Sequence, residues 1–428
     1  MRPPEKAGHG KRGKPCSEAF SRLFHLVAEG AFFKGADLAP WLVYTFGKGA
    51  QDGPCPRQEQ GRRKGPGLKQ NDSTDAARAE GMAGDDAAGG MSLLETELSR
   101  RPEGMRAGRL VAADGTILRY ALARPKEGLV RGTVTILPGR ADCIEHHYET
   151  IGDLLGRGYA VAILDWRGQG LSSRPLRNRL RGHVRSFRLY EADLEAFMRR
   201  VVLPECPPPH FALAASMGAH VLLHASWRHV WFERALLVSP MIRIRRRRMP
   251  EWWWHLLSTA AVWAGLGWLF VPGVRKRPLT EADFPGNPLT GDRRRFRREA
   301  LLLERHPELA LGGPTLGWLR AALSSSRRLW KHAESRDVPL WPLMAVAAGN
   351  DRLVDTEATR IFAHDVAGMA CIVLQGARHD ILIESDRHRE ALLAAFDSFI
   401  SGQGADQPAA LAPSLAPSSS PAAMRESA

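Results

Sequence analysis

The sequence predicts an α/β protein built on a mostly parallel, doubly wound sheet with an inserted helical cap. Short apolar segments alternate with amphipathic helical patterns along most of the chain. This alternation stops at Ser239–Pro240 and resumes near Val338, which indicates an insertion of about a hundred residues. Hydrophobic residues make up 44% of the 428-residue chain and charged residues 25%, as in globular proteins with a sizeable core.

The strand candidates are short and apolar or β-branched, and several are apolar throughout, as strands covered on both faces must be. They are Gly108–Ala113, Leu118–Ala123, Gly132–Leu137, Ala160–Asp165, His210–Ala214, Ala235–Val238, Pro342–Ala347 and Ala370–Leu374. The helical patterns between them are Glu145–Arg157, Phe187–Val202, Met217–Arg228, Thr356–Val366 and Ser385–Ile400. Connections of this length favour right-handed crossovers.

Composition divides the chain into four parts. We expect residues 1–90 to be a disordered N-terminal extension, because residues 47–90 are loop-like and lack a sustained hydrophobic period. Residues 91–240 and 337–401 form the predicted core, and residues 241–336 form the predicted cap. Residues 402–428 are rich in Ala, Pro and Ser and predict a disordered tail.

The positive charge of the protein is concentrated in the cap. The formal net charge is +14, and residues 241–336 hold 19 Lys and Arg against 8 Asp and Glu. This excess predicts a basic surface on one part of the molecule that could meet an anionic membrane. The arginine clusters carry no recognised nucleic-acid motif, so we expect no nucleic-acid partner.

The five cysteines are scattered, and none forms a pair or cluster with zinc-like spacing. The sequence therefore predicts neither a disulfide framework nor a metal site. The N-terminus lacks the pattern of a secretory signal peptide, so we expect a cytoplasmic protein.

Ser216 is the candidate nucleophile. It stands between the strand that ends near Ala214 and a helix that begins with Met217, with Gly218 two residues after it. A nucleophile elbow needs small residues at these flanking positions, because the turn is tight. Gly218 meets this demand and Ala214 meets it less well, so the pattern is A-x-S-x-G.

The serine also needs a base and a carboxylate that orients the base. His379 follows the last predicted strand and is the candidate base. Asp351 follows the strand before it and is the candidate acid, with Asp355 as a rival. The order Ser, Asp, His along the chain fits a hydrolase of this layout, and both loops lie at the carboxyl edge of the sheet.

The oxyanion hole requires two backbone N–H groups. One candidate is Met217, which follows the nucleophile directly. The other is Arg140, in the loop after the third strand, where Gly139 gives the backbone room.

These motifs resemble those of the α/β-hydrolases, and within them the bacterial lysophospholipase and monoacylglycerol lipase-like group. The run LDWRGQGLS at 164–172 is similar to the D-x-R-G-x-G-x-S signature of that fold. The other segments that carry the resemblance are Gly182–Val184, Ser216–Gly218, Pro307–Leu319, Gly349–Arg352 and His379–Glu384.

The resemblance covers about Leu110 to Ile400 and implies a carboxylic ester hydrolase without cofactor. It also implies an acyl-lipid substrate, either a lysophospholipid or a monoacylglycerol. The family usually has G-H-S-M-G-G or A-H-S-M-G-G at the elbow, whereas this chain has Ala214-Ala215-Ser216-Met217-Gly218-Ala219. A catalytically weak or silent lipid-binding homologue and an acyl transferase therefore stay as alternatives.

The cap contains an apolar stretch that could contact lipid. From Trp252 to Val274 there is no Asp, Glu, Lys or Arg, and arginine clusters lie on both sides. A helix at the membrane interface or along a substrate channel suits the three adjacent tryptophans better than a bilayer span, and an ordinary buried cap helix is a further possibility. The expected location is thus cytoplasmic, with peripheral contact at the inner face of the membrane.

Overall fold

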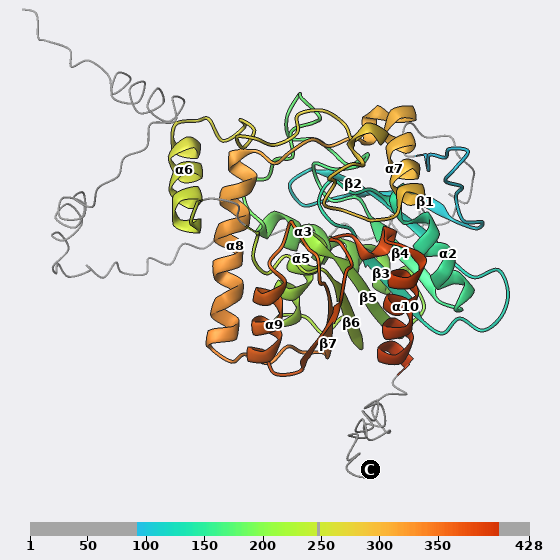
Figure 1. The fold of residues 1–428 in the computed structure, drawn as a ribbon. Coiled ribbons are helices and arrows are strands. Elements are labelled where there is room, and N and C mark those ends of the chain that lie inside the picture. The colour runs from blue at the N-terminus through green and yellow to red at the C-terminus, as the bar shows by residue number, and fades with distance from the viewer. Residues whose placement is uncertain (1–91, 246–248, 402–428) are drawn as a thin grey trace, which may run out of the picture. The chain divides into compact units, whose positions relative to one another are not determined.

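A computed structural model describes residues 92–245 and 249–401, and the predicted extension and tail lie outside these residues. The described part contains one eight-stranded sheet in the order β1-β2-β4-β3-β5-β6-β7-β8 (Figure 1). β2 runs antiparallel to both of its neighbours, and the other adjacent pairs are parallel. The strands are β1 (Arg106–Val111), β2 (Ile117–Ala123), β3 (Thr133–Leu137), β4 (Ala160–Leu164), β5 (His210–Ala215), β6 (Arg234–Val238), β7 (Leu343–Ala348) and β8 (Met369–Leu374). The predicted mostly parallel α/β sheet is confirmed.

Helices cover both faces of the sheet because successive strand residues point to opposite sides and both sets are apolar. On β4, Val161 and Ile163 pack with the layer of α2 (Tyr148–Gly156) and α10 (Asp386–Ser401). Ala162 and Leu164 pack with the opposite layer. That layer includes α3 (Arg188–Phe197), the π-helical η2 (Met198–Val202), α5 (Ser216–Ser226) and α9 (Thr356–Asp365). The short α4 (Leu203–Glu205) and η1 (Ile144–His147) complete the core helices.

The insertion between β6 and β7 is helical, as predicted. It contains α6 (Glu251–Trp263), η3 (Glu281–Asp283), α7 (Arg293–Arg305), η4 (Pro307–Leu309) and α8 (Leu316–Glu334). α6 and α8 lie side by side (Figure 1). Trp254 packs against a small apolar cluster that includes Leu319 and Leu323 of α8.

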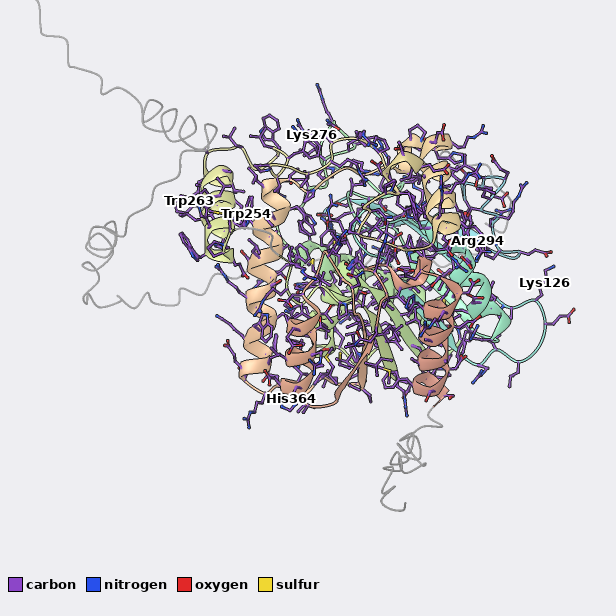
Figure 2. The ribbon with its side chains drawn as sticks, viewed as in Figure 1. Lys126, Trp254, Trp263, Lys276, Arg294 and His364 are labelled. Atoms are coloured by element: carbon purple, nitrogen blue, oxygen red, sulfur yellow. The ribbon has the colours of Figure 1, made fainter. Side chains whose placement is uncertain are left out.

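The apolar stretch of the cap does not form one long helix. α6 ends at Trp263, and Gly265 follows with a φ of +74°, a backbone conformation typical of helix ends. Among the described residues, no helix combines the length and apolarity needed to span a bilayer. Figure 2 shows Trp263 on the outer side of α6 and Trp254 on the side toward α8.

Candidate active site

The elbow at Ser216 joins β5 directly to α5. Ser216 is the first residue of α5 and has a φ of +47°, a strained conformation for a residue with a β-carbon. Gly218 is required by the close approach of β3: a β-carbon there would lie 2.2 Å from the carbonyl oxygen of Leu137 and 2.5 Å from that of Pro138. The tight elbow thus depends on Gly218, whereas Ala214 is tolerated in the buried strand.

The side chains of Asp351, His379 and Ser216 meet at the carboxyl edge of the sheet. His379 Nδ1 lies 2.7 Å from Asp351 Oδ2, and His379 Nε2 lies 3.0 Å from Ser216 Oγ. Because a carboxylate can only accept, Nδ1 carries the proton and Nε2 is free to accept the hydroxyl hydrogen. Asp351 and His379 are both buried.

Asp351 also shapes the loop that presents it. Its Oδ1 accepts hydrogen bonds from the backbone N–H groups of Leu353 at 2.7 Å and Val354 at 2.9 Å. One oxygen therefore fixes the turn and the other fixes the imidazole. The rival acid Asp355 instead accepts from the N–H of Ala358 at the start of α9 and lies 3.8 Å from Arg243. It makes no hydrogen bond to His379 among those described.

Two backbone N–H groups lie beside Ser216 and are available to an oxyanion, as judged from the described residues. Gly139 N–H donates to Asp142 Oδ2 at 3.1 Å, and Ala141 N–H donates to Gln169 Oε1 at 2.6 Å, but no described residue accepts from the Arg140 N–H between them. Met217 lies in the first turn of α5, where N–H groups have no partner within the helix. A β-carbon on Gly139 would lie 3.5 Å from Ser216 Cβ, so the loop is directly against the nucleophile.

Asp142 fixes the loop after β3 by accepting a hydrogen bond from Gly139 N–H, a role that the sequence analysis missed. Its two oxygens lie 2.9 Å from His146 Nδ1 and 2.8 Å from His147 Nε2. Burial opposes protonation of His147, but the charge of Asp142, its hydrogen bond to His147 and the charge of Asp380 together outweigh burial and raise the pKa of His147. Conversely, burial alone would raise the pKa of Asp142, but the charges and hydrogen bonds of His147 and His146 together outweigh burial and lower that pKa far below the usual value. The sequence signal that could have revealed this role is Asp142 itself, a carboxylate three residues after Gly139.

Gln169 is a second residue that the sequence analysis left without a role. Its carbonyl oxygen holds Ala141, and its amide nitrogen lies 3.9 Å from Met217 Sδ. It therefore touches both segments that carry the candidate oxyanion donors. The run LDWRGQGLS at 164–172, which contains Gln169, also contains buried Asp165. Asp165 pairs with Arg119, so this part of the run supports the fold.

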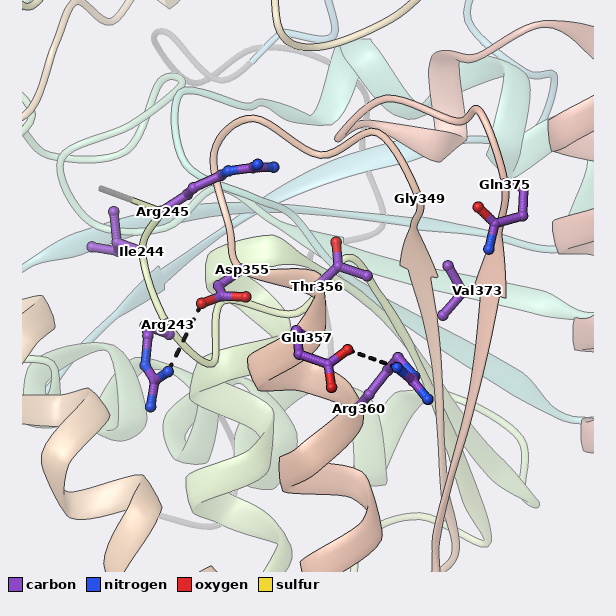
Figure 3. Close-up of a pocket in the computed structure, with 10 residues that line it drawn as sticks. All are labelled: Arg243, Ile244, Arg245, Gly349, Asp355, Thr356, Glu357, Arg360, Val373 and Gln375. Carbon is purple, nitrogen blue, oxygen red and sulfur yellow. Dashed lines mark hydrogen bonds and ion pairs between the residues drawn. The ribbon is translucent and has the colours of Figure 1, made fainter. Parts of the chain in front are cut away.

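A cavity of about 860 Å³ lies near the triad loops but contains none of the three side chains. Its charged lining is largely paired within itself: Arg243 lies 3.8 Å from Asp355, and Arg360 donates to Glu357 at 2.7 Å (Figure 3). In the described part of the chain, no group of three or more His, Cys, Asp and Glu could hold a metal ion.

Comparison with known proteins identifies the family to which this chain belongs. The profile of the family described as serine aminopeptidase, S33, matches residues 128–386. Lysophospholipase L2 of Escherichia coli K12 is 32% identical over 279 residues, which cover 62% of this chain and 79% of that protein. The probable lysophospholipase L2 of Haemophilus influenzae is 27% identical over 288 residues, 67% of this chain and 89% of that protein.

Solved structures share the fold. A soluble variant of monoglyceride lipase from Saccharomyces cerevisiae, in complex with a substrate analog, matches with a TM-score of 0.54 and 17% identity over 72% of this chain and 98% of its own. A carboxyl esterase from Bacillus coagulans, in complex with glycerol, matches with a TM-score of 0.52 and 15% identity over 70% and 99%. These matches confirm the α/β-hydrolase fold.

Proposed function

Because the chain belongs to the serine aminopeptidase S33 family and is a carboxylic ester hydrolase, we propose that it cleaves single-chain acyl lipids through an acyl-enzyme on Ser216. The substrate is a lysophospholipid or a monoacylglycerol. The hydrogen-bonded series from Asp351 through His379 to Ser216 carries this proposal.

In the proposed reaction, His379 Nε2 takes the proton of Ser216 as Oγ attacks the ester carbonyl carbon. The tetrahedral oxyanion accepts hydrogen bonds from the Arg140 and Met217 N–H groups. The carbon–oxygen bond to the glycerol then breaks, and the imidazolium returns its proton to the leaving oxygen. Water deprotonated by His379 attacks the acyl-enzyme and releases a fatty acid, while Asp351 holds the ring throughout.

The lipid character of the substrate is supported by the relatives and by the cap. The curated relatives are lysophospholipases by name, and one structural neighbour is a monoglyceride lipase. We propose that residues 241–336 act as a cap that selects the acyl chain and headgroup. No observation favours nucleic acid as a partner.

We also propose that α6 contacts an anionic membrane at the cytoplasmic face. Trp252, Leu256 and Trp263 follow one another at spacings of four and seven residues, so they lie on one side of the helix. Their exposed fractions are 63%, 60% and 84%. Tryptophan and nearby basic residues are the side chains that favour the lipid–water interface.

Replacement of Ser216 by Ala tests the function. Wild-type protein should hydrolyse 1-oleoyl lysophospholipid or 1-oleoylglycerol and react with a fluorophosphonate probe, and S216A should do neither, with an unchanged circular dichroism spectrum. S226A is the matched control, because Ser226 is a buried serine of the same helix whose Oγ donates to the Leu223 carbonyl. It should keep both activities.

The alternatives give different results. Hydrolysis that survives in S216A would exclude Ser216 as the nucleophile. A wild-type protein that binds lipid but neither labels nor hydrolyses would be a silent homologue. Acyl transfer to an added alcohol in preference to water would identify an acyl transferase.

A further inference from the structure

The side chain of Arg140 enters the junction between the core and the cap. Its Nη2 donates to the carbonyl oxygen of Gly312 at 2.6 Å, and its Cζ lies 5.3 Å from the centroid of the Trp318 ring. Gly182 permits this approach, since a β-carbon there would lie 2.4 Å from Nη2. The buried Nε has no hydrogen-bond partner. Most of the five donors thus find no acceptor among the described residues.

Two arginines that are more fully buried than Arg140 are neutralised by acids. Arg119 and Arg167 each lie between two carboxylates. The carboxylates are Glu145 and Asp165 for the first and Asp193 and Asp114 for the second. Arg140 forms no ion pair with any carboxylate in the described part of the chain. A partly buried cation without a counter-charge among the described residues is costly, so its presence beside the nucleophile calls for a physical reason.

Arg174 shows how a purely structural arginine is satisfied without an acid. It donates five hydrogen bonds to backbone carbonyls, those of Gly168, Gly170, Arg179, Glu308 and Leu309. Burial lowers the pKa of Arg174 and that of Arg140 to about 10, so both stay charged at neutral pH. The terminal nitrogens of Arg174 find five acceptors among the described residues and those of Arg140 find one, while the Nε of each arginine has no partner there.

A second cation, Arg275, acts on Arg140. Burial is the largest cause of the lowered pKa of Arg140, and the positive charge of Arg275 lowers that pKa further. Arg275 lies on an adjacent irregular segment of the cap, where its carbonyl oxygen accepts from Gly313 N–H at 2.7 Å. An anion placed at the Arg140 guanidinium would supply both the missing acceptors and the missing charge.

We propose that the Arg140 guanidinium binds the phosphodiester of a lysophospholipid and so makes this enzyme prefer lysophospholipids to monoacylglycerols. This inference rests on the function proposed above. Guanidinium groups bind phosphate oxygens through paired, charge-assisted hydrogen bonds, which a neutral glycerol cannot offer. Arg140 would then be a specificity-determining residue through its side chain and an oxyanion donor through its backbone.

The two roles fit the dimensions of one substrate. About six covalent bonds, or roughly 7 Å, separate the backbone nitrogen of an arginine from its Cζ. About six bonds also separate the ester carbonyl carbon of a lysophospholipid from its phosphorus, a similar reach. A substrate whose carbonyl oxygen binds the Arg140 N–H can therefore bring its phosphate to the guanidinium of the same residue.

The test is a ratio of kcat/KM values for two monomeric substrates with the same acyl chain, 1-oleoyl lysophosphatidylglycerol and 1-oleoylglycerol. We expect R140Q to lower the lysophospholipid-to-monoacylglycerol ratio about 10- to 100-fold, and R140K, which keeps the charge, to lower it less. R174Q is the matched control, because it removes another partly buried arginine that links the core to the cap. It should leave the ratio unchanged even if it lowers both rates. An unchanged ratio in R140Q would overturn the inference.

Binding separates this inference from the proposed function. In the S216A background, dodecylphosphocholine should bind at least tenfold more weakly to the R140Q variant, while 1-O-dodecylglycerol should bind both proteins alike, as measured by calorimetry. This result would support phosphate binding even if the wild-type protein hydrolysed neither lipid. Equal loss for both ligands would mean that Arg140 only holds the cap in place, and the inference would fail.

Discussion

The edge of the sheet and the cap differ in how their polar and aromatic side chains are satisfied. At the sheet edge, both oxygens of Asp351 and both oxygens of Asp142 accept hydrogen bonds from specific partners. In the cap region, the Arg140 guanidinium has one acceptor, and Trp263 projects from α6 with most of its surface exposed. The carboxylates of the first region are satisfied by the described residues, and the second region offers groups that a ligand or a surface could satisfy.

This difference separates two tasks within one chain. Parallel strands bring the loops that follow them to one edge, so a few hydrogen bonds suffice to fix reacting groups there. Chain segments in the cap are positioned by packing between α6 and α8 and by contacts between loops. We infer that the sheet edge sets the reaction and the cap sets what is brought to it. Four predictions test this division, from the largest expected effect to the smallest.

The largest effect should come from Asp351. In D351N the amide can donate to His379 Nδ1, which stabilises the wrong tautomer and leaves Nε2 unable to accept the Ser216 proton. We expect kcat to fall about 10⁴-fold with little change in fold, as for the equivalent change in a well-studied triad. Steady-state ester hydrolysis measures this loss.

D355N is the matched control for D351N. Asp355 caps α9 and lies outside the hydrogen bonds of His379, so its replacement should leave kcat within about twofold and cost at most about 1 kcal/mol of unfolding free energy. If D355N lost activity and D351N kept it, the assignment of the acid would be reversed.

Gly218 should give the next largest effect, on stability. In G218A the new β-carbon would lie 2.2 Å from the Leu137 carbonyl oxygen, so β3 or α5 must shift. We expect the unfolding free energy to fall by about 3 kcal/mol or more, together with the oxyanion geometry. Urea denaturation checks this value.

Replacement of Gly152, in the same domain, should have the opposite effect on the unfolding free energy. Gly152 lies in α2, and a β-carbon there would have no atom within 4 Å. G152A should therefore stabilise the protein by about 0.5–1 kcal/mol. A G218A variant as stable as G152A would contradict the view that the elbow is tightly packed.

The strands and the triad could be predicted because they depend on local signals. Apolar segments found all eight strands, with boundaries that differ from those in the structure by a few residues at most. Once the strand order along the chain is known, Asp351 and His379 must lie at the same edge as Ser216. The sequence favoured Asp351 over Asp355 by its position after the strand but could not exclude Asp355, because the pairing depends on which carboxylate the turn directs toward His379.

The roles of Asp142, Gln169 and the Arg140 side chain could not be predicted. Each depends on a contact between segments distant in sequence, such as the 172 residues that separate Arg140 from Gly312. The apolar stretch from Trp252 was long enough for a span, but its length alone did not reveal the break after Trp263. Local patterns thus predict elements, while long-range contacts decide which polar groups remain unpartnered.

A smaller effect should come from Asp380, which follows the candidate base. Burial, reinforced by the charge of Asp142, raises the pKa of Asp380 to about 6. The folded protein therefore keeps a proton between about pH 4 and pH 6 that the unfolded chain releases, and stability falls as the pH rises through this window. From pH 4 to pH 7, the wild-type protein should lose about 2 kcal/mol more unfolding free energy than D380N.

Denaturant titrations at several pH values measure this difference. D365N, which changes an exposed carboxylate at the end of α9, should follow the wild-type pH dependence. A D380N curve parallel to that of the wild-type protein would show that the carboxyl of Asp380 is well solvated, and that the sheet edge is less tightly enclosed than proposed.

The smallest effect on the fold, and the sharpest contrast with the sheet edge, should come from the outer face of α6. In the double variant W252S/W263S two exposed indoles are removed, so the unfolding free energy should change by less than about 0.5 kcal/mol. Cosedimentation with vesicles that contain phosphatidylglycerol should nevertheless fall about tenfold, because the indole rings supply the interfacial contact. L129S is the matched control: Leu129 is 91% exposed on the loop between β2 and β3, and its replacement should leave vesicle binding unchanged. Equal binding by the wild-type protein and W252S/W263S would exclude α6 as the membrane contact, while leaving the triad and the Arg140 proposal untouched.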